Sequence, residues 1–544
     1  MTGGPSPPRL GDSDTWIPSL NRHPRPPQGA AAHLACLPVL ASVPTFALEG
    51  VDAREVIVEV DVRQGLPVFT VVGLPDTAVR EARERVRAAL LNSELEFPLQ
   101  RLTVNLAPAW VRKAGASFDL AIAVGVLAAS GQVPATALDG CAVSGELSLG
   151  GALRPVRGAL SIAVGCRDAG LTRLVVAPEI AHEAALVEGV EVCAVPSLRR
   201  LVDLLHGRWA PDPPVLPRGQ RPPAVPELPD LADVRGQADA RRALEIAAAG
   251  GHSLLMVGPP GAGKTMLARR LPGILPPPTP EEALEITRVQ SVAGIGAGRL
   301  ACERPFRAPH HTISAPGLVG GGSRPRPGEM TLAHRGVLFL DELPEFSRTA
   351  LEALRQPLES GGVEVTRGQV SLRFPARVLL IAAANPCPCG VGGERCECGT
   401  IARERYRTRL SGPLIDRVDL VCQLAPVPAL SLTAGAPPGE SSAAVRRRVV
   451  AARERQAARL AATAASCNAE LGARATRRLA RLDRRASRPL VDALDAGVLT
   501  GRGHDRVLRV ARTIADLAGC ERIGGEHVDE ALGYRATGSG RVAA

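Results

Sequence analysis

Lysine and aromatic residues are scarce in this chain of 544 residues. Lysine and arginine together number 65, but only Lys113 and Lys264 are lysines. Aromatic side chains make up 2% of the chain, which excludes a nucleic-acid surface that depends mainly on base stacking. A run of about eighteen apolar residues, the length of a membrane span, does not occur. The apolar residues 30–48 are interrupted by Pro38 and Pro44, so we expect neither a signal peptide nor membrane association.

The formal net charge is +10, and almost all of the positively charged residues are arginines. Such a charge favours polyanionic partners, although an arginine-rich composition alone would produce the same balance. If nucleic acid is the partner, contacts between arginine and phosphate must supply most of the affinity.

One of the two lysines lies in the sequence Gly-Pro-Pro-Gly-Ala-Gly-Lys-Thr at residues 258–265. This pattern is typical of a phosphate-binding loop, in which backbone N–H groups surround the phosphates of a nucleoside triphosphate. Lys264 would reach the β- and γ-phosphate oxygens, and Thr265 would place its hydroxyl on Mg²⁺. The predicted nucleotide-binding residues are Gly258, Pro259, Pro260, Gly261, Ala262, Gly263, Lys264 and Thr265.

The segments around this loop have the expected order. Residues 253–257 predict a buried strand before it, and residues 265–271 predict a helix after it, which Pro272 would end. Because strand, loop and helix follow one another, we expect ATP binding.

Two further strands end in polar residues that suit ATP hydrolysis. The apolar residues 336–340 are followed by Asp341, placed to hold the Mg²⁺ shell, and by Glu342, placed to polarise the attacking water. The strand at 378–384 is followed by Asn385, whose amide could orient water; an asparagine before proline is also an ordinary turn residue.

Composition divides the chain into five parts. We expect a disordered N-terminal extension over 1–44, an α/β domain over 45–206, a Pro-rich linker over 207–229, a nucleotide-binding α/β domain over 230–436 and a helical domain over 437–544. In the first α/β domain, strands are predicted at 56–62 and 68–72, and helices at 76–91 and 120–129.

The order of these motifs resembles the AAA+ ATPases, and more narrowly the magnesium-chelatase-subunit-I-like branch with its ComM (YifB) family. The stretches that carry the closer resemblance are Val234-Arg-Gly-Gln237, Arg307-Ala-Pro-His-His-Thr312, Gly328-Glu-Met-Thr-Leu-Ala-His334 and Leu410-Ser-Gly-Pro-Leu-Ile-Asp-Arg-Val-Asp-Leu420. The resemblance implies an α/β fold with three parts: an N-terminal Lon-protease-like domain of the ribosomal protein S5 domain 2 type, a central AAA+ phosphate-loop domain and a C-terminal helical lid.

The same resemblance implies roles for three residues. Asn385 matches sensor 1, and Arg417 matches the arginine finger that reaches the ATP of a neighbouring subunit. Arg502 matches sensor 2, although Arg506 and Arg509 follow one and two helical turns later. A finger that acts in trans requires a subunit interface, and the rings of this family are hexamers.

The implied function is a cytoplasmic, hexameric DNA helicase that hydrolyses ATP with Mg²⁺ and promotes branch migration in recombination of transforming DNA. Branched or single-stranded DNA would be its partner. Twelve cysteines in a chain with a nucleotide loop agree with a reducing compartment. One alternative is a magnesium-chelatase-type motor subunit that remodels a metal-insertion partner. Another is a protease-like unfoldase.

The N-terminal region tests the unfoldase alternative. Residues 113–120 and 145–155 resemble the proteolytic domain of Lon, and Ser117 falls on its nucleophile position. The partner lysine should fall near position 160, where this chain has Leu160. Arginine cannot act as that base because it does not deprotonate. We therefore expect a non-proteolytic domain, in which Lys113 is structural or contacts phosphate.

Two arginine features have two interpretations each. Residues 363–373 predict a hairpin with a Gly-Gln turn, and Arg367 at its tip is either a DNA contact in a ring pore or an ordinary turn charge. A set of arginines at helical spacing predicts one basic face that is either solvated or lines a DNA path. The set is Arg474, Arg477, Arg478, Arg481 and Arg485.

Four cysteines follow Asn385 closely. They form two C-x-C pairs, Cys387 with Cys389 and Cys396 with Cys398, separated by six residues. Four thiolates this close suit tetrahedral Zn²⁺, although the spacing within each pair is tighter than the usual C-x₂-C. The alternative is a glycine-rich loop with free thiols.

Overall fold

The computed structural model describes residues 40–113, 115–214, 228–296, 298–322, 326–367, 370–410, 417–427, 439–483, 485–497 and 499–539. Most of the predicted N-terminal extension and of the Pro-rich linker therefore lies outside the described residues. Residues 40–44, however, belong to strand β1 (Leu40–Glu49), which pairs antiparallel with β2 (Asp52–Arg63). The α/β region thus begins earlier than residue 45, because Ala41 and Val43 alternate into its core. The other boundaries stay predictions.

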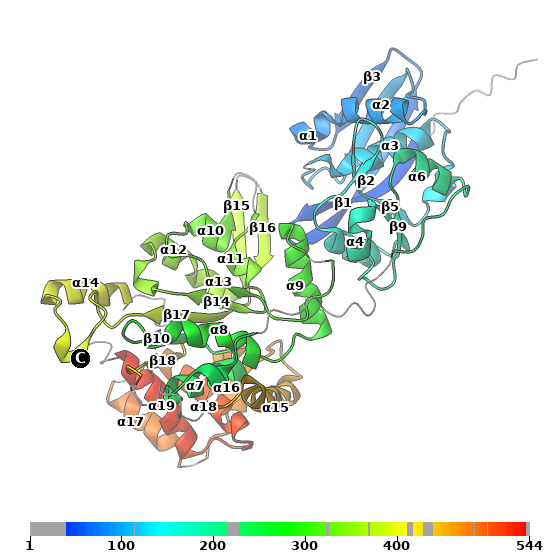
Figure 1. Cartoon of the computed structure of the whole chain (residues 1–544). Coiled ribbons are helices and arrows are strands. Elements are labelled where there is room, and N and C mark those ends of the chain that lie inside the picture. Colours follow the sequence, from blue (N-terminus) through cyan, green and yellow to red (C-terminus); the bar gives the residue numbers. More distant parts are fainter. Residues whose placement is uncertain are drawn as a thin grey trace, which may run out of the picture. The chain divides into compact units, whose positions relative to one another are not determined.

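The N-terminal region contains two main sheets. The first has the order β1-β2-β4-β3, with β4 (Arg101–Ala107) antiparallel to β2 and parallel to β3 (Val68–Val72). Helix α3 (Asp119–Ala129) packs against β1 and β2, and all of its residues are buried (Figure 1). A run of small and branched apolar residues forms this helix because both of its sides face the core.

The second sheet is parallel and has the order β5-β8-β9. Its strands are β5 (Cys141–Val143), β8 (Arg173–Val176) and β9 (Glu191–Ala194). The remaining elements of this region are the hairpin strands β6 (Glu146–Leu147) and β7 (Leu153–Arg154) and helices α1 (Thr77–Arg80), α2 (Ala82–Asn92), α4 (Ala159–Asp168), α5 (Pro178–Ala184) and α6 (Leu198–Leu205).

The central region is built on a five-stranded parallel sheet with the order β11-β14-β17-β10-β18. The strands are β10 (Leu254–Val257), β11 (Phe306–Arg307), β14 (Val337–Leu340), β17 (Leu379–Ala384) and β18 (Leu420–Gln423). Along β10, Leu254 and Met256 pack into one apolar cluster, whereas Leu255 and Val257 pack into another. The sheet is therefore covered on both faces, which is why its strands are continuously apolar.

Helices and short hairpins surround this sheet (Figure 1). The helices are α7 (Ala238–Gly250), α8 (Lys264–Ile274), α9 (Pro280–Ala293), α10 (Ala315–Val319), α11 (Glu329–Leu332), α12 (Arg348–Ala353), α13 (Arg355–Ser360) and α14 (Thr400–Leu410). The hairpins are β12 (Gly320–Gly321) with β13 (Arg326–Pro327), and β15 (Gly362–Arg367) with β16 (Val370–Pro375).

The C-terminal region is helical, as predicted. Its helices are α15 (Ser442–Leu460), α16 (Ala473–Leu479), α17 (Ser487–Asp495), α18 (Gly501–Leu517) and α19 (Gly525–Ser539). Helix α15 packs against α7, α8 and α18, so the helical region shares an apolar cluster with one face of the central sheet. Within the described part of the chain, no helix is long and apolar enough to cross a membrane.

The structure corrects two expectations about helices. Pro272 does not end α8, which continues to Ile274. Pro272 lacks the N–H that would pair with the Ala268 carbonyl, but the helical turn persists beyond it, since the N–H of Leu275 donates to the Leu271 carbonyl at 3.1 Å.

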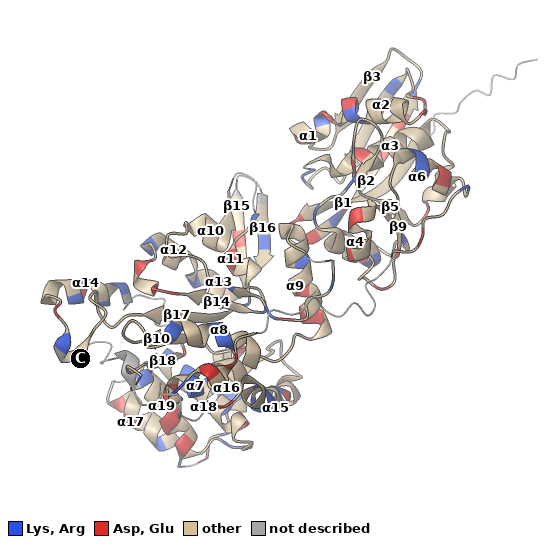
Figure 2. Ribbon diagram, viewed as in Figure 1, with Lys and Arg blue, Asp and Glu red and all other residues tan. Residues whose placement is uncertain are grey.

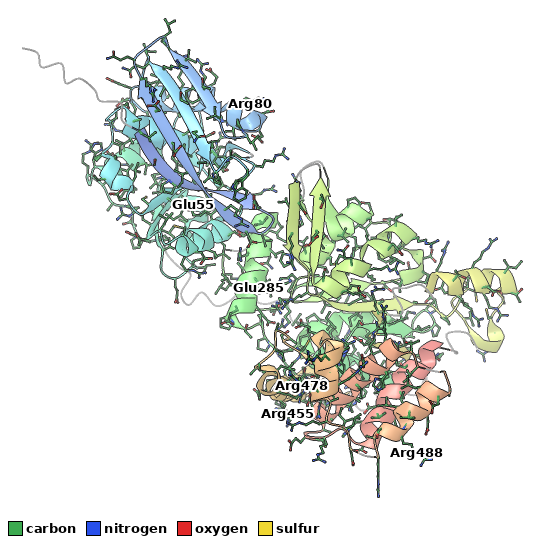
Figure 3. All side chains as sticks on the ribbon, turned by 180° about the vertical axis from the view of Figure 1, so that it is seen from behind. Glu55, Arg80, Glu285, Arg455, Arg478 and Arg488 are labelled. Carbon is green, nitrogen blue, oxygen red and sulfur yellow. The ribbon has the colours of Figure 1, made fainter. Side chains whose placement is uncertain are left out.

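The predicted arginine face is also wrong. Helix α16 ends at Leu479, and Arg481 has a positive φ of 42°, so Arg481 and Arg485 do not continue its surface. Arg477 pairs with Asp505 at 3.1 Å, and Arg481 pairs with Glu521 at 2.7 Å. Figure 2 shows acidic residues among the basic ones in this region, and in Figure 3 the labelled Arg455, Arg478 and Arg488 lie on separate helices.

Candidate nucleotide-binding site

The phosphate-loop sequence connects the central strand β10 to the first residue of α8. Parallel pairing with β17 and β18 places the end of β10 next to the ends of both neighbours. Gly263 has a φ of 92°, which a residue with a Cβ rarely adopts, and it is followed directly by Lys264. The loop therefore delivers its lysine to a helix N-terminus at the carboxyl edge of the sheet, where backbone N–H groups favour anions.

Lys264 joins the loop to the adjacent strand end. Its Nζ donates hydrogen bonds to the carbonyls of Gly258 at 2.6 Å and Pro259 at 3.0 Å, and to Oδ1 of Asn385 at 3.0 Å. Burial lowers the pKa of Lys264, while the nearby carboxylates of Asp341 and Glu342 act in the opposite direction. In a nucleotide complex, phosphate oxygens would take the place of these carbonyl and amide oxygens as acceptors for the ammonium group.

Thr265 and Asp341 form the part of the site that suits a metal ion. The Thr265 hydroxyl donates to Oδ2 of Asp341 at 2.7 Å, and Oδ1 of Asp341 accepts from the backbone N–H of Glu342 at 3.0 Å. A hydroxyl and a carboxylate on adjacent elements are oxygen ligands of the type that Mg²⁺ prefers. The residues present therefore fit Mg²⁺.

Glu342 is held beside a histidine. It has a positive φ of 51°, and its Oε2 lies 3.2 Å from Nδ1 of His311. The His311 ring lies 4.1 Å from that of His310 and meets Phe346 edge-on. The αL backbone of a non-glycine residue costs energy and is common at functional sites. The carboxylate is thus positioned by a turn and by a titratable partner.

Asn385 is held at both ends. Its side chain accepts from Lys264, and its backbone carbonyl accepts from the Tyr406 hydroxyl of α14 at 3.1 Å. Burial raises the pKa of Tyr406 to about 12, so this hydroxyl remains a donor at neutral pH. Asn385 is therefore held through both its side chain and its backbone.

The four cysteines that follow Asn385 come together in space. The Sγ atoms of Cys387, Cys389, Cys396 and Cys398 all lie within 4.8 Å of one another. Among the described residues, this is the one group of at least three potential ligand side chains that could hold a metal ion.

Family comparisons agree with this architecture. Residues 230–432 match the family described as "Magnesium chelatase, subunit ChlI", residues 58–180 match "Subunit ChlI of Mg-chelatase" and residues 439–535 match "Magnesium chelatase, subunit ChlI C-terminal". The uncharacterized protein YifB of Salmonella typhimurium is 46% identical over 499 residues, which cover 91% of this chain and 97% of that protein. The chain belongs to the ComM/YifB family.

Two further relatives extend the similarity. Competence protein ComM of Haemophilus influenzae is 44% identical over 503 residues, which cover 91% of this chain and 97% of ComM. YifB of Escherichia coli is 44% identical over 501 residues, with the same coverage of both chains. The predicted ComM/YifB resemblance is therefore confirmed, as is the α/β AAA+ fold with a helical C-terminal region.

The residues that the ComM/YifB resemblance assigned to sensing lie in different surroundings. Arg417 forms an ion pair with Glu359 of α13 at 2.6 Å, and its carbonyl accepts from the Ser253 hydroxyl at 3.1 Å. Arg502 is exposed in the first turn of α18. Arg506 and Arg509 both lie 3.8 Å from the buried Asp419. The finger and sensor 2 roles stay predictions.

The N-terminal region has no lysine at the position a peptidase dyad would need. Leu160 lies in α4 with 0% exposure, inside an apolar cluster. Lys113 is also buried, and its Nζ donates to the carbonyl of Pro108. Of the two roles considered for Lys113, its burial favours the structural one. Ser117 lies in a short 3-10 turn at Ala116–Phe118.

The predicted hairpin is confirmed. Strands β15 and β16 pair antiparallel with Arg367 opposite Val370. The two turn residues and the Arg367 side chain lie outside the described residues, so the DNA-contact interpretation of Arg367 stays a prediction.

Two residues of the site were not given roles from the sequence. His311 lies beside Glu342, and the Nε2 of Gln237 donates to the carbonyls of Ala262 in the loop at 3.1 Å and Ala425 at 2.6 Å. Both occur within stretches that resemble the ComM/YifB family. That resemblance was the available signal, but it did not state which atoms they contact.

Proposed function

We propose that this protein is an ATP-hydrolysing hexameric ring motor that moves on DNA in the cytoplasm and promotes branch migration during recombination of transforming DNA. Lys264 would bind the β- and γ-phosphates, Asn385 would orient water against the γ-phosphate, and Glu342 would polarise that water. Bound Mg²⁺, held through Thr265 and Asp341, would neutralise charge that develops on the phosphates.

The main support is the hydrogen-bonded group at the strand ends. Lys264 contacts Asn385 across β10 and β17, and Thr265 contacts Asp341 across α8 and the end of β14. Three separate strands thus contribute residues to one site, which is the arrangement that phosphoryl transfer requires, since catalysis depends on positioned charges. A purely structural nucleotide site would not need Glu342 beside it.

The hexamer rests on the family resemblance and on the finger role that the resemblance implies for Arg417. A trans-acting arginine finger stabilises the transition state only at a subunit interface, and head-to-tail contacts of this kind form a ring when the rotation between subunits closes. Replacing Arg417 with alanine should leave nucleotide binding intact and lower hydrolysis at least tenfold. Mass photometry in the presence of ATP measures ring assembly directly, and a monomer at all protein concentrations would contradict this part of the proposal.

DNA as the track is supported by the net charge of +10, by the hairpin β15–β16 and by the similarity to a protein named competence protein ComM. The chelatase descriptions of the matching families favour a second candidate, a motor that remodels a metal-insertion enzyme. The two candidates differ in what should stimulate hydrolysis.

The deciding experiment measures the ATPase rate of the full chain with forked DNA, duplex DNA and no DNA at several salt concentrations. Forked DNA should raise the rate, and stimulation should fall with salt because phosphate contacts release counterions. Arg367→Ala should reduce the stimulation, whereas the exposed Arg488→Ala on α17 serves as the matched control. A well-assembled hexamer that no DNA binds or stimulates would refute the helicase proposal.

A further inference from the structure

The cysteine group is arranged as a metal site requires. The separations between Sγ atoms are 3.2 Å from Cys387 to Cys389 and 3.8 Å from Cys389 to Cys396, and Cys398 completes the group. Four sulfurs around tetrahedral zinc, each at about 2.3 Å from the metal, lie about 3.8 Å from one another. The side chains therefore need only small shifts to surround one ion.

The backbone of the loop also supports thiolate ligands. The N–H of Cys389 donates to Sγ of Cys398 at 3.2 Å, and the N–H of Gly392 donates to Sγ of Cys387 at 3.3 Å. Backbone N–H donors of this kind orient the thiolates that would bind the metal and stabilise the negative charge on their sulfur atoms. The chain must reverse between the two cysteine pairs, and Gly390 makes this possible with a φ of 83°.

The other described cysteines are not grouped in this way. Five of them are buried and Cys302 and Cys520 are exposed, and none belongs to a group of at least three ligand side chains that could hold a metal ion. The convergence of four sulfurs is thus a property of this loop and not of the cysteine content of the chain.

The same loop packs beside the phosphate loop. Gly258 and Pro259 of the phosphate loop line a cavity of about 250 Å³ together with Cys387, Gly392 and Cys396. Gly390 is packed against the phosphate loop so closely that a Cβ added to it would lie 2.9 Å from Cδ of Pro260.

The loop also connects Asn385 to the helix that holds its backbone. It begins directly after Asn385 and leads into α14, whose Tyr406 hydroxyl donates to the Asn385 carbonyl. A change in the path of the loop would therefore move both its contact with the phosphate loop and the hydrogen bond between Tyr406 and Asn385.

We propose that Cys387, Cys389, Cys396 and Cys398 bind one zinc ion, and that this ion holds their loop in place against the phosphate loop. Zinc with four thiolates is coordinatively saturated and acts as a cross-link, not as a catalyst. Its binding offsets the conformational entropy of a glycine-rich segment that has little apolar surface to bury. The coupling to nucleotide rests on the proposed ATP site, whereas metal binding does not.

The first experiment measures metal content in the purified full chain. We expect one zinc per chain by elemental analysis, and cobalt substitution should give thiolate-to-cobalt charge-transfer absorption and the bands of a tetrahedral centre. Cys389→Ser and Cys398→Ser should lose zinc, and Cys302→Ser and Cys520→Ser are matched exposed controls that should keep it. Absence of zinc together with failure to bind cobalt, or disulfides among the four cysteines, would overturn the assignment.

The second experiment measures the affinity for a fluorescent ATP analogue in excess Mg²⁺. Removing zinc from the wild-type protein with a zinc-selective chelator should weaken binding by about tenfold, the scale of effects seen when support around a site is lost, and added zinc should restore it. This reversible treatment does not depend on a variant that folds. Unchanged affinity in the zinc-free protein would overturn the role of zinc in supporting the phosphate loop.

Lys264→Ala separates the two proposals. This variant should lose nucleotide affinity but retain one zinc, because Lys264 does not contact the cysteines in the hydrogen bonds described above. Retained nucleotide binding in Lys264→Ala would contradict the proposed ATP site without touching the zinc assignment. Loss of zinc from a folded Lys264→Ala protein would contradict the independence of the metal site.

Discussion

The two lysines of the chain lie in different regions and are used differently. In the central region, Lys264 is partly buried and donates to two carbonyls and to Asn385 at the carboxyl edge of a parallel sheet. In the N-terminal region, Lys113 is fully buried and donates to the carbonyl of Pro108. Burial lowers the pKa of both. A lysine that can exchange its acceptors for phosphate suits binding, whereas one enclosed by the core stabilises a local backbone path.

Two buried aspartates show the same contrast. In the N-terminal region, burial raises the pKa of Asp119 even though Arg85 pairs with it at 2.7 Å. In the central region, burial opposes the ionisation of Asp419, but His252, Arg509 and Arg506 outweigh it and lower its pKa to about 2. The central region therefore uses several charged partners to keep a carboxylate ionised at the junction of β18 and α18.

The largest expected effect tests the functional lysine. Lys264→Ala should lower ATP hydrolysis at least about a thousandfold, ~4 kcal/mol of transition-state stabilisation, because the ammonium has no substitute at the phosphates. A coupled ATPase assay measures this, with circular dichroism to show that the fold is retained. Appreciable remaining turnover would refute the assignment of Lys264.

The next effect tests the two aspartates. Asp419→Asn should reduce the free energy of unfolding by about 3 kcal/mol near neutral pH, because it leaves buried cationic partners uncompensated. The contribution of Asp419 is fully present above the unfolded-state pKa of about 4 and is lost as the pH falls through about 2. Urea unfolding from pH 7 to pH 2 should therefore show the variant and wild-type curves converging in acid.

Asp119→Asn is the matched control for that series. Because the folded-state pKa of Asp119 is raised, any stability linked to its protonation is present at low pH and lost as the pH rises through that value. Because asparagine resembles a protonated aspartate, both variants should approach wild type in acid. Near neutral pH, however, this linkage should leave Asp119→Asn at least as stable as wild type, whereas Asp419→Asn is less stable. An equal loss of stability in both variants near neutral pH would show that the contrast between the regions is wrong.

A smaller effect tests the structural lysine. Lys113→Ala should lower the free energy of unfolding by about 2 kcal/mol, because it removes buried methylene groups and leaves the Pro108 carbonyl without its donor. The ATPase rate per folded molecule should stay unchanged. If the rate falls with no loss of stability, Lys113 contributes to function and the contrast with Lys264 fails.

The smallest effect concerns His311. The pair between His311 and Glu342 is partly exposed, so its interaction free energy is less than about 1 kcal/mol. We expect His311→Ala to release the Glu342 carboxylate towards water and to raise the basal ATPase rate about threefold. Initial rates without DNA measure this, and His310→Ala is the neighbouring control. A rate that falls would indicate that His311 holds Glu342 in its active position.

Patterns carried by consecutive residues were the ones that could be predicted. The strand at 68–72 and the paired strands β15 and β16 agree with the structure because the alternation of side chains along a strand is a local property. The prediction of one arginine face was wrong because periodicity does not reveal where a helix ends. Helix α16 ends before Arg481, which has a positive φ. The expectation that Pro272 ends α8 was wrong because a proline removes one helical hydrogen bond without stopping the helix at that residue, and α8 continues to Ile274.

Residue types and their spacing identify the side chains that could carry the chemistry: one lysine in a glycine-rich loop, two acids after a strand and four closely spaced cysteines. Which of their atoms meet depends on how the strands are ordered in the sheet. Lys264 contacts Asn385 because β10 and β17 are neighbours in the sheet, and Glu342 contacts His311 because β11 and β14 are neighbours. Sheet order depends on contacts between residues far apart in the chain, which no local pattern encodes. The burial of Lys113 likewise depends on tertiary packing, because residues distant in the sequence surround it.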